Sequence, residues 1–187
     1  MLIRPMIPAD FDAVWPVLRD IARARETYAL DPELDRAAGW ALWGEAPRAT
    51  FVAERDGVIL GSYYIKPNAA GPGDHVCNAG YIVAPAARGQ GVAAALCAHS
   101  LAEAARMGFA AMQFNMVVAS NQVAVRLWRR HGFLIVGTLP GAYRHATLGP
   151  VDCHVMYRTL DDQAACERSG RFGNRHAGGR TVDGHAG

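Results

Sequence analysis

The run Arg88-Gly89-Gln90-Gly91-Val92-Ala93 stands between an apolar segment, residues 81–83, and an alanine-rich stretch that begins at Ala94. This order predicts a strand, a tight turn with two glycines, and a helix. A helix start presents unpaired backbone N–H groups and the positive end of the helix dipole, and both favour an anion. Glycine lets a phosphate approach where a Cβ atom would block it. The sequence therefore predicts a phosphate-binding turn in the middle of the chain.

Three kinds of cofactor loop share this outline, and the sequence argues against two of them. A dinucleotide loop would have a third glycine where Ala94 stands and an acidic residue about 20 positions later, near Ala111. A nucleoside-triphosphate loop would continue with Lys-Ser or Lys-Thr, but Gly91 is followed by Val92 and Ala93. The third kind holds the pyrophosphate of coenzyme A, and the alternative without a ligand is an ordinary glycine turn.

The composition is typical of a soluble globular chain, with 51% hydrophobic residues, 19% charged residues and a net charge of +2. This weak charge gives no reason to expect nucleic acid or an anionic membrane as a partner. No apolar run approaches the ~20 residues that span a bilayer. The four cysteines are widely spaced and form no C-x-x-C pair, so buried reduced thiols in the cytoplasm are expected, without disulfides or a metal site.

The hydrophobic pattern predicts elements in the order β-α-α-β-β-β-α-β-α-β-β, which indicates an α/β (α+β) fold with a mixed sheet flanked by helices. Asp56-Gly57 predicts a tight hairpin turn, and Pro16 is expected to split or kink the first helix. Residues 1–160 are expected to form one domain. Residues 161–187 are rich in Gly, Arg and His and are expected to be disordered. Strands are expected over residues 2–6, 50–54, 58–65, 76–83, 111–117, 133–139 and 151–159, and helices over 9–26, 31–43, 89–107 and 121–131.

Two motifs in the correct order resemble those of the GNAT family of acyl-CoA N-acetyltransferases. Arg88-x-x-Gly91-x-Ala93 is similar to the family's R/Q-x-x-G-x-G/A, and the later Asn121-x-x-Ala124-x-x-Leu127-Trp128-x-x-x-Gly132-Phe133 is similar to N-x-x-A-x-x-L-Y-x-x-x-G-F. The resemblance implies the GNAT fold over residues 2–160, acetyl-CoA as the cofactor and a homodimer. The residues implied to bind the cofactor are Ile82, Val83, Arg88, Gly89, Gln90, Gly91, Val92, Ala93 and Asn121.

One position departs from the family pattern. Trp128 replaces the tyrosine that is proposed to protonate the CoA thiolate, and an indole cannot deliver a proton at neutral pH. The pKa of a thiol is ~8.5, so protonation of the leaving thiolate by water is tolerable. Trp128 is therefore expected to pack against the cofactor or the core.

A narrower resemblance concerns the azetidine-2-carboxylate (proline-analogue) N-acetyltransferases, which also carry the tryptophan. Asn78, Asn115 and Asn121 recur at their spacing, and Phe114-Asn115-Met116-Val117 is similar to their F-N-x-V. The resemblance implies that Asn78 and Asn115 line the acceptor site and that Asn121 supports CoA. The acceptor is then a small amine or amino acid. The alternatives are a protein amine and an acyl-CoA-binding module without turnover.

Strand parity places Asn78 on one face of its strand with Gly80 and Ile82, and Asn115 on one face with Gln113 and Val117. An asparagine inside an apolar strand needs hydrogen-bond partners, which a polar pocket or neighbouring backbone could supply.

Asparagine cannot serve as a general base, but it can orient an amine or a water and donate to a developing oxyanion. The sequence thus predicts direct transfer in a ternary complex, with Asn78 and Asn115 as the catalytic candidates and no covalent acyl-enzyme. Water, or one of His75, Asp74 and Glu26, is expected to take the proton.

Overall fold

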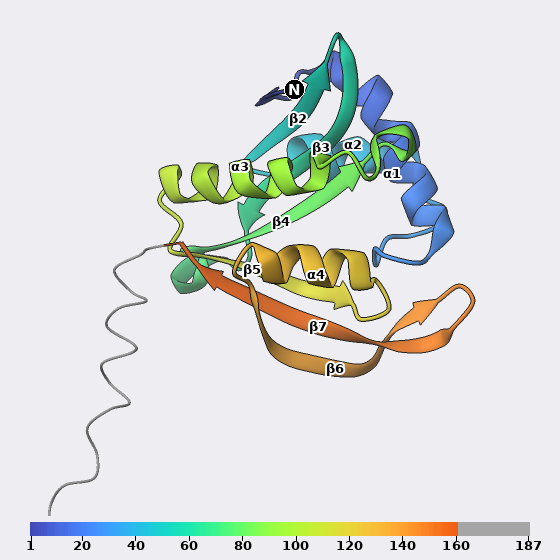
Figure 1. Ribbon diagram of the computed structural model, residues 1–187, viewed down its shortest axis with the longest axis vertical. Helices are drawn as coiled ribbons and strands as arrows, with labels where there is room; N and C mark the ends of the chain where they lie inside the picture. Colours follow the sequence, from blue (N-terminus) through green and yellow to red (C-terminus); the bar gives the residue numbers. More distant parts are fainter. Residues whose placement is uncertain (161–187) are drawn as a thin grey trace, which may run out of the picture.

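The computed structural model describes residues 1–160, which form one seven-stranded mixed sheet with helices on both faces (Figure 1). The strand order is β1-β2-β3-β4-β5-β7-β6, with β4 and β5 parallel and every other pair antiparallel. The predicted α/β class and element order are confirmed. The expected disorder of residues 161–187 lies outside the described residues.

The strands are β1 (Leu2–Pro5), β2 (Ala49–Arg55), β3 (Val58–Pro67), β4 (Val76–Val83), β5 (Ala111–Val118), β6 (Leu134–His145) and β7 (Gly149–Thr159). The α-helices are α1 (Phe11–Ala24), α2 (Arg36–Trp40), α3 (Val92–Arg106) and α4 (Gln122–Arg130). Within residues 1–160, none of these helices is long and apolar enough to cross a membrane.

The two faces of the sheet bury two separate cores. On one face, Leu18 of α1 packs in a cluster with Ile82 of β4. On the other face, Leu96 of α3 and Trp128 of α4 share a larger cluster with Tyr81 of β4. Neighbouring residues of β4 therefore serve opposite faces, as strand geometry requires.

Local sequence explains most element boundaries. Asp56 and Gly57 both take positive φ values, 52° and 78°, as the predicted tight hairpin turn needs. Pro16 lies inside α1 without ending it, so the expected split does not occur. Helix α3 begins at Val92 rather than at the predicted residue 89, because Gly89 and Gly91 both adopt left-handed backbone with φ of 77° and 78°.

Two further predicted elements differ from the structure, by five residues or more. The second helix begins at Arg36 rather than residue 31, because Asp31 forms a local turn with Glu33 and Asp35 caps the helix through the Ala38 N–H at 2.8 Å. A wider π-type turn, Ala41–Glu45, follows it. Strand β6 continues to His145, six residues beyond its predicted end, because it stays paired with β7.

The pairing of β4 with β5 is short, and this shapes the rest of the molecule. The two strands pair at only two positions, Val76 with Ala111 and Cys77 with Met112. On its other side β4 stays paired with β3 as far as Val83. Among residues 1–160, the side of residues 79–83 that faces away from β3 thus has no strand partner. We call it the open edge of β4.

Candidate active site

The alternation of hydrogen bonds along β4 decides which backbone groups face its open edge. The Ala84 N–H donates to the Leu60 carbonyl at 2.9 Å, and the Asn68 N–H donates to the Val76 carbonyl at 2.8 Å. Even-numbered residues of β4 therefore bond to β3, and odd-numbered ones face the open edge. The resemblance implied pairing of a cofactor with Ile82 and Val83, but the backbone of Ile82 faces β3. Val83 and Tyr81 present their backbone groups to the open edge.

The hydroxyl of Tyr28 lies on the open edge and satisfies both backbone groups of Tyr81. It accepts from the Tyr81 N–H at 2.6 Å and donates to the Tyr81 carbonyl at 2.8 Å. Burial, helped by the neighbouring Tyr64, raises the pKa of Tyr28 well above its usual value. The hydroxyl is thus protonated at neutral pH, as its double role as donor and acceptor requires.

The loop that carries Tyr28 is held by the tip of the β6–β7 hairpin. The Tyr143 hydroxyl donates to the Tyr28 carbonyl at 3.0 Å, and the Ala146 N–H donates to the Arg25 carbonyl at 3.1 Å. A surface depression lies between this loop and the hairpin, lined in part by Tyr28, Tyr143, Arg25 and Arg144. The open edge of β4 is therefore closed off on this side by a segment that two hydrogen bonds hold in place.

The predicted phosphate-binding turn directly follows β4 and is exposed. An added Cβ atom at Gly89 or Gly91 would meet no atom of residues 1–160 within 4 Å, so the left-handed backbone at these glycines faces open space in this part of the chain. The Gln90 side chain folds back to donate to the Ala86 carbonyl at 2.8 Å. Arg88 is exposed beside the turn, whereas the Val92 side chain is buried and leaves only its backbone for a ligand. Backbone N–H groups, helix start and free space fit a pyrophosphate.

Asn78 bridges β4 and β5 one residue beyond their last ladder pair. Its Nδ2 donates to the Gln113 carbonyl at 2.8 Å, and its Oδ1 lies 3.4 Å from the Tyr64 hydroxyl. The Tyr64 ring covers Gly80, where a Cβ atom would lie 2.5 Å from the ring. The side chains of Tyr64 on β3 and Asn78 on β4 therefore lie on one face of the sheet, which we call the polar face.

Asn115 belongs to the same face and lies in a bulge of β5. Its Nδ2 donates to Asn68 Oδ1 at 2.7 Å, and its Oδ1 accepts from Gln113 Nε2 at 2.8 Å. The parity prediction that placed Val117 on this face is wrong. The register of β5 against β7 shifts between Phe114 and Val117, so Val117 returns to the α3 and α4 side.

Three further kinds of side chain near β4 and α4 have structural roles. The Trp128 ring centroid lies 4.8 Å from that of Tyr81, so Trp128 packs in the core as expected. Burial raises the pKa of Cys77 and of Cys97 to about 12, which makes both thiols unreactive at neutral pH. Asn121 Oδ1 accepts from the Ala124 N–H at 3.1 Å and caps α4, as its type predicts.

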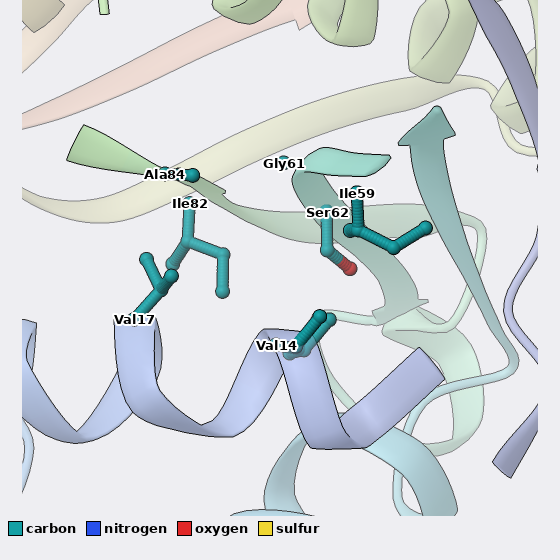
Figure 2. Close-up of a pocket in the computed structure, with 8 residues that line it drawn as sticks. Val14, Val17, Ile59, Gly61, Ser62, Ile82 and Ala84 are labelled. Carbon is teal, nitrogen blue, oxygen red and sulfur yellow. The ribbon is translucent and has the colours of Figure 1, made fainter. Parts of the chain in front are cut away.

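A narrow cavity lies between α1 and strands β3 and β4, and Figure 2 shows Val14, Val17 and Ile82 around it. Among the described residues that line it, the one polar side chain is Ser62, whose hydroxyl accepts from Trp43 Nε1 at 2.9 Å and donates to the Phe51 carbonyl at 2.8 Å. This cavity is part of the α1 core, and its one polar side chain in the described part of the chain is already hydrogen-bonded.

The separated strands, the phosphate-type turn and the two sequence motifs point to one family, whose acetyltransferase (GNAT) model matches residues 15–133. The chain belongs to the GNAT family. The wider resemblance found in the sequence is thereby confirmed, whereas the azetidine-2-carboxylate subgroup stays a hypothesis.

Individual relatives agree with this assignment. The N-acetyltransferase aca1 of Schizosaccharomyces pombe is 41% identical over 108 residues, which are 56% of this chain and 52% of that protein. The match thus spans about half the length of this curated relative. A GCN5-related N-acetyltransferase from Kribbella flavida is 46% identical, with a TM-score of 0.81 over 84% of this chain and 96% of that one. A phosphinothricin acetyltransferase from Sinorhizobium meliloti, solved with AcCoA, shares the fold at 17% identity, with a TM-score of 0.75 over 86% and 89% of the two chains.

Proposed function

We propose that this GNAT protein is an acetyl-CoA-dependent N-acetyltransferase that acetylates a small amine or an amino acid directly, in a ternary complex. The observation that carries the proposal is the early separation of β5 from β4, which leaves an open edge that ends at a phosphate-type turn. Acetyl-CoA, when bound, supplies an acetyl group activated as a thioester. The S. meliloti relative solved with AcCoA supports this donor.

Different groups along β4 and the turn that follows it would bind different parts of acetyl-CoA. The N–H groups of the turn at residues 88–93 and of the first turn of α3 would hold the pyrophosphate. The backbone of Val83 would pair with the pantetheine arm as a neighbouring strand does. Arg88 and the start of α4 at Asn121 would add contacts from either side.

Tyr81 has the N–H that is best placed to polarise a thioester carbonyl, because it faces the open edge. It is already bonded to the Tyr28 hydroxyl, so Tyr28 would withdraw when the donor binds. A backbone donor fixed by the sheet stabilises developing negative charge without having to reorient.

Asn78 would orient the acceptor amine through Oδ1, because its Nδ2 is already bonded to β5. An amide does not accept a proton at neutral pH, so the amine would arrive deprotonated. Exposed groups such as His75, or water, would take the proton that is released afterwards. Turnover would therefore rise with pH until the acceptor amine is fully deprotonated.

The proposal includes a cytoplasmic location, which fits the buried free thiols Cys77, Cys97 and Cys153. It also includes a homodimer. Strand β6 is an edge of the sheet and exposes Leu134, Val136 and Leu139, with 70%, 59% and 43% of their surface accessible. An exposed apolar edge strand favours pairing with another chain. Sedimentation as a dimer that Val136→Lys converts to a monomer would support this, and sedimentation of wild type as a monomer would contradict it.

The deciding experiment for function is a thiol-release assay with acetyl-CoA over amino acids, proline analogues, polyamines and peptides. Turnover with small amines or amino acids is expected. Turnover with peptides alone would assign a protein amine as the acceptor. Binding of acetyl-CoA without turnover of any acceptor would leave a non-catalytic acyl-CoA-binding module.

A further inference from the structure

Lys66 is the only lysine in the chain, and it lies on the polar face beside Asn78. The two residues are cross-strand partners in the β3–β4 ladder, and they form a hydrogen-bonded pair by the alternation described above. Tyr64, two residues before Lys66, points to the same face. Lys66 is half-buried, and its Nζ lies 5.5 Å from the centroid of the Tyr64 ring.

The Lys66 ammonium has no carboxylate partner within residues 1–160. The ion pairs of this part of the chain all use arginines, namely Arg4, Arg19, Arg36 and Arg106. Its contact with the face of the Tyr64 ring is a weak attraction at a partly exposed site. A half-buried cation beside a candidate active site therefore remains available to an anionic group.

Some of the neighbouring side-chain amide groups are already hydrogen-bonded, and others can form a further hydrogen bond. Asn78 Nδ2, Asn115 Nδ2 and Gln113 Nε2 already donate to protein oxygens at 2.7–2.8 Å. Asn78 Oδ1 has only the long 3.4 Å contact with the Tyr64 hydroxyl, so it can accept a further hydrogen bond. Asn68 Oδ1 is used by Asn115, while its own Nδ2 donates to no group of residues 1–160. An acceptor oxygen at Asn78 thus lies next to a cation at Lys66.

We propose that Lys66 binds the carboxylate of the acceptor, which makes the acceptor an amino or imino acid with a free carboxylate. This inference rests on the proposed acetyltransferase function. In an α-amino acid the amine and the carboxylate are separated by one carbon atom. Paired residues of an antiparallel ladder lie ~5.5 Å apart at Cα, so Asn78 can hold the amine while the flexible Lys66 chain reaches the carboxylate. Lys66 is thereby a specificity-determining residue.

The rival site for a carboxylate is the depression beside Tyr28, where Arg25 and Arg144 contribute to the lining. Both arginines are exposed, whereas Lys66 is half-buried and paired with Asn78. A charge that is partly shielded from water discriminates more strongly between an ionised and a neutral ligand than an exposed one does. The observations therefore favour Lys66, and Arg144→Met serves as the matched control.

The test compares L-proline and L-azetidine-2-carboxylate with their primary amides, which keep the amine and lose the charge. Each pair is assayed with wild type, Lys66→Met, Lys66→Arg and Arg144→Met, with concentrations corrected for the fraction of free amine. Lys66→Met is expected to raise KM for the acids about 10- to 100-fold, the loss of one charge-assisted hydrogen bond. It should leave kcat, KM for acetyl-CoA and KM for the amides within about threefold, and Lys66→Arg should restore most of the affinity.

Three results with the variants would overturn the inference while the proposed function stands. These are equal losses for acids and amides in Lys66→Met, no loss for either, or the acid-specific loss appearing in Arg144→Met instead. Wild-type turnover of the amides or of simple amines, with none of the acids, would also overturn it. If wild type transfers acetyl to no small amine at all, the proposed function itself fails, and the thiol-release assay separates that outcome from the others.

Discussion

The two halves of β4 have different neighbours. At Val76 and Cys77 the strand is paired on both sides, and the chain behaves as ordinary sheet. At residues 79–83 it is paired only with β3, and a tyrosine hydroxyl from a distant loop meets Tyr81 on the other side. A buried strand edge without a partner costs free energy. Residues 79–83 therefore lack the sheet hydrogen bonds that Val76 and Cys77 make with β5. The free backbone groups at this edge can bind a ligand instead.

The largest expected effect comes from the turn that ends the open half. Gly91→Val places a β-branched side chain at φ 78° in the space that a pyrophosphate would use. Strain and lost N–H contacts together predict a rise of roughly 1,000-fold in the dissociation constant of acetyl-CoA, measured by calorimetry.

Gly57→Val is the matched control, because Gly57 has the same φ and equally open space in the β2–β3 hairpin. Both variants should lose stability by about 1–3 kcal/mol. Only Gly91→Val should lose acetyl-CoA. Equal affinity in the two variants would contradict the role of the turn.

The next largest effect is expected at the point where the two halves of β4 meet. Asn78→Ala removes the group that orients the acceptor, and a misplaced nucleophile costs roughly 100-fold in turnover. The dissociation constant of acetyl-CoA should stay within about threefold of wild type. Asn115→Ala should cost less in kcat, because both polar atoms of the Asn115 side chain are already hydrogen-bonded, to Asn68 and Gln113. Unchanged kcat in Asn78→Ala would remove Asn78 from the mechanism.

Tyr28→Phe probes the open edge itself. Loss of the hydroxyl leaves the Tyr81 N–H and carbonyl without their partner, which should lower the free energy of unfolding by about 1–3 kcal/mol in urea titrations. Saturating acetyl-CoA should recover much of this loss, because it would supply a new partner to the same groups.

Tyr143→Phe is the control for that experiment, because it removes only the bond to the Tyr28 carbonyl. Its smaller loss of stability should be the same with and without acetyl-CoA. If the ligand leaves the Tyr28→Phe deficit unchanged, acetyl-CoA does not reach Tyr81.

The last expected effect concerns pH and two buried thiols in the core between β4 and α3. Burial raises the pKa of Cys77 and Cys97 to about 12, from 9.0 for a free thiol, so the unfolded chain releases these protons first. Their contribution to stability is complete below pH 9 and is lost as pH rises toward 12. Urea titrations at pH 7.5, 9 and 10.5 should show a falling free energy of unfolding, which should fall less steeply with pH in a double Cys→Ala variant. A free energy of unfolding that does not change with pH in wild type would contradict this role of the two thiols.

Activity, by contrast, should rise with pH over the range in which the acceptor amine deprotonates.

Local patterns made much of the fold predictable. The Asp56-Gly57 turn and the two glycines before α3 each follow from backbone requirements of a few consecutive residues. The Val117 error has the opposite origin, because a bulge depends on the register with β7 and leaves no mark on a single strand.

The site was predictable in part. Its turn and asparagines carry sequence motifs, whereas the Tyr28 contact joins residues 53 positions apart and has no local pattern. Lys66 could have been noticed as the only lysine. Its position opposite Asn78, however, depends on the β3–β4 register, which forms across the loop of residues 68–75 and leaves no local pattern in the sequence.

The most direct test of the open edge and the turn as the acetyl-CoA site is backbone hydrogen exchange with and without saturating acetyl-CoA. Slower exchange is expected at the Val83 amide and in the turn at residues 88–93, with the β2–β3 hairpin unchanged. Unchanged exchange at the open edge and the turn, under conditions in which acetyl-CoA is shown to bind, would contradict it.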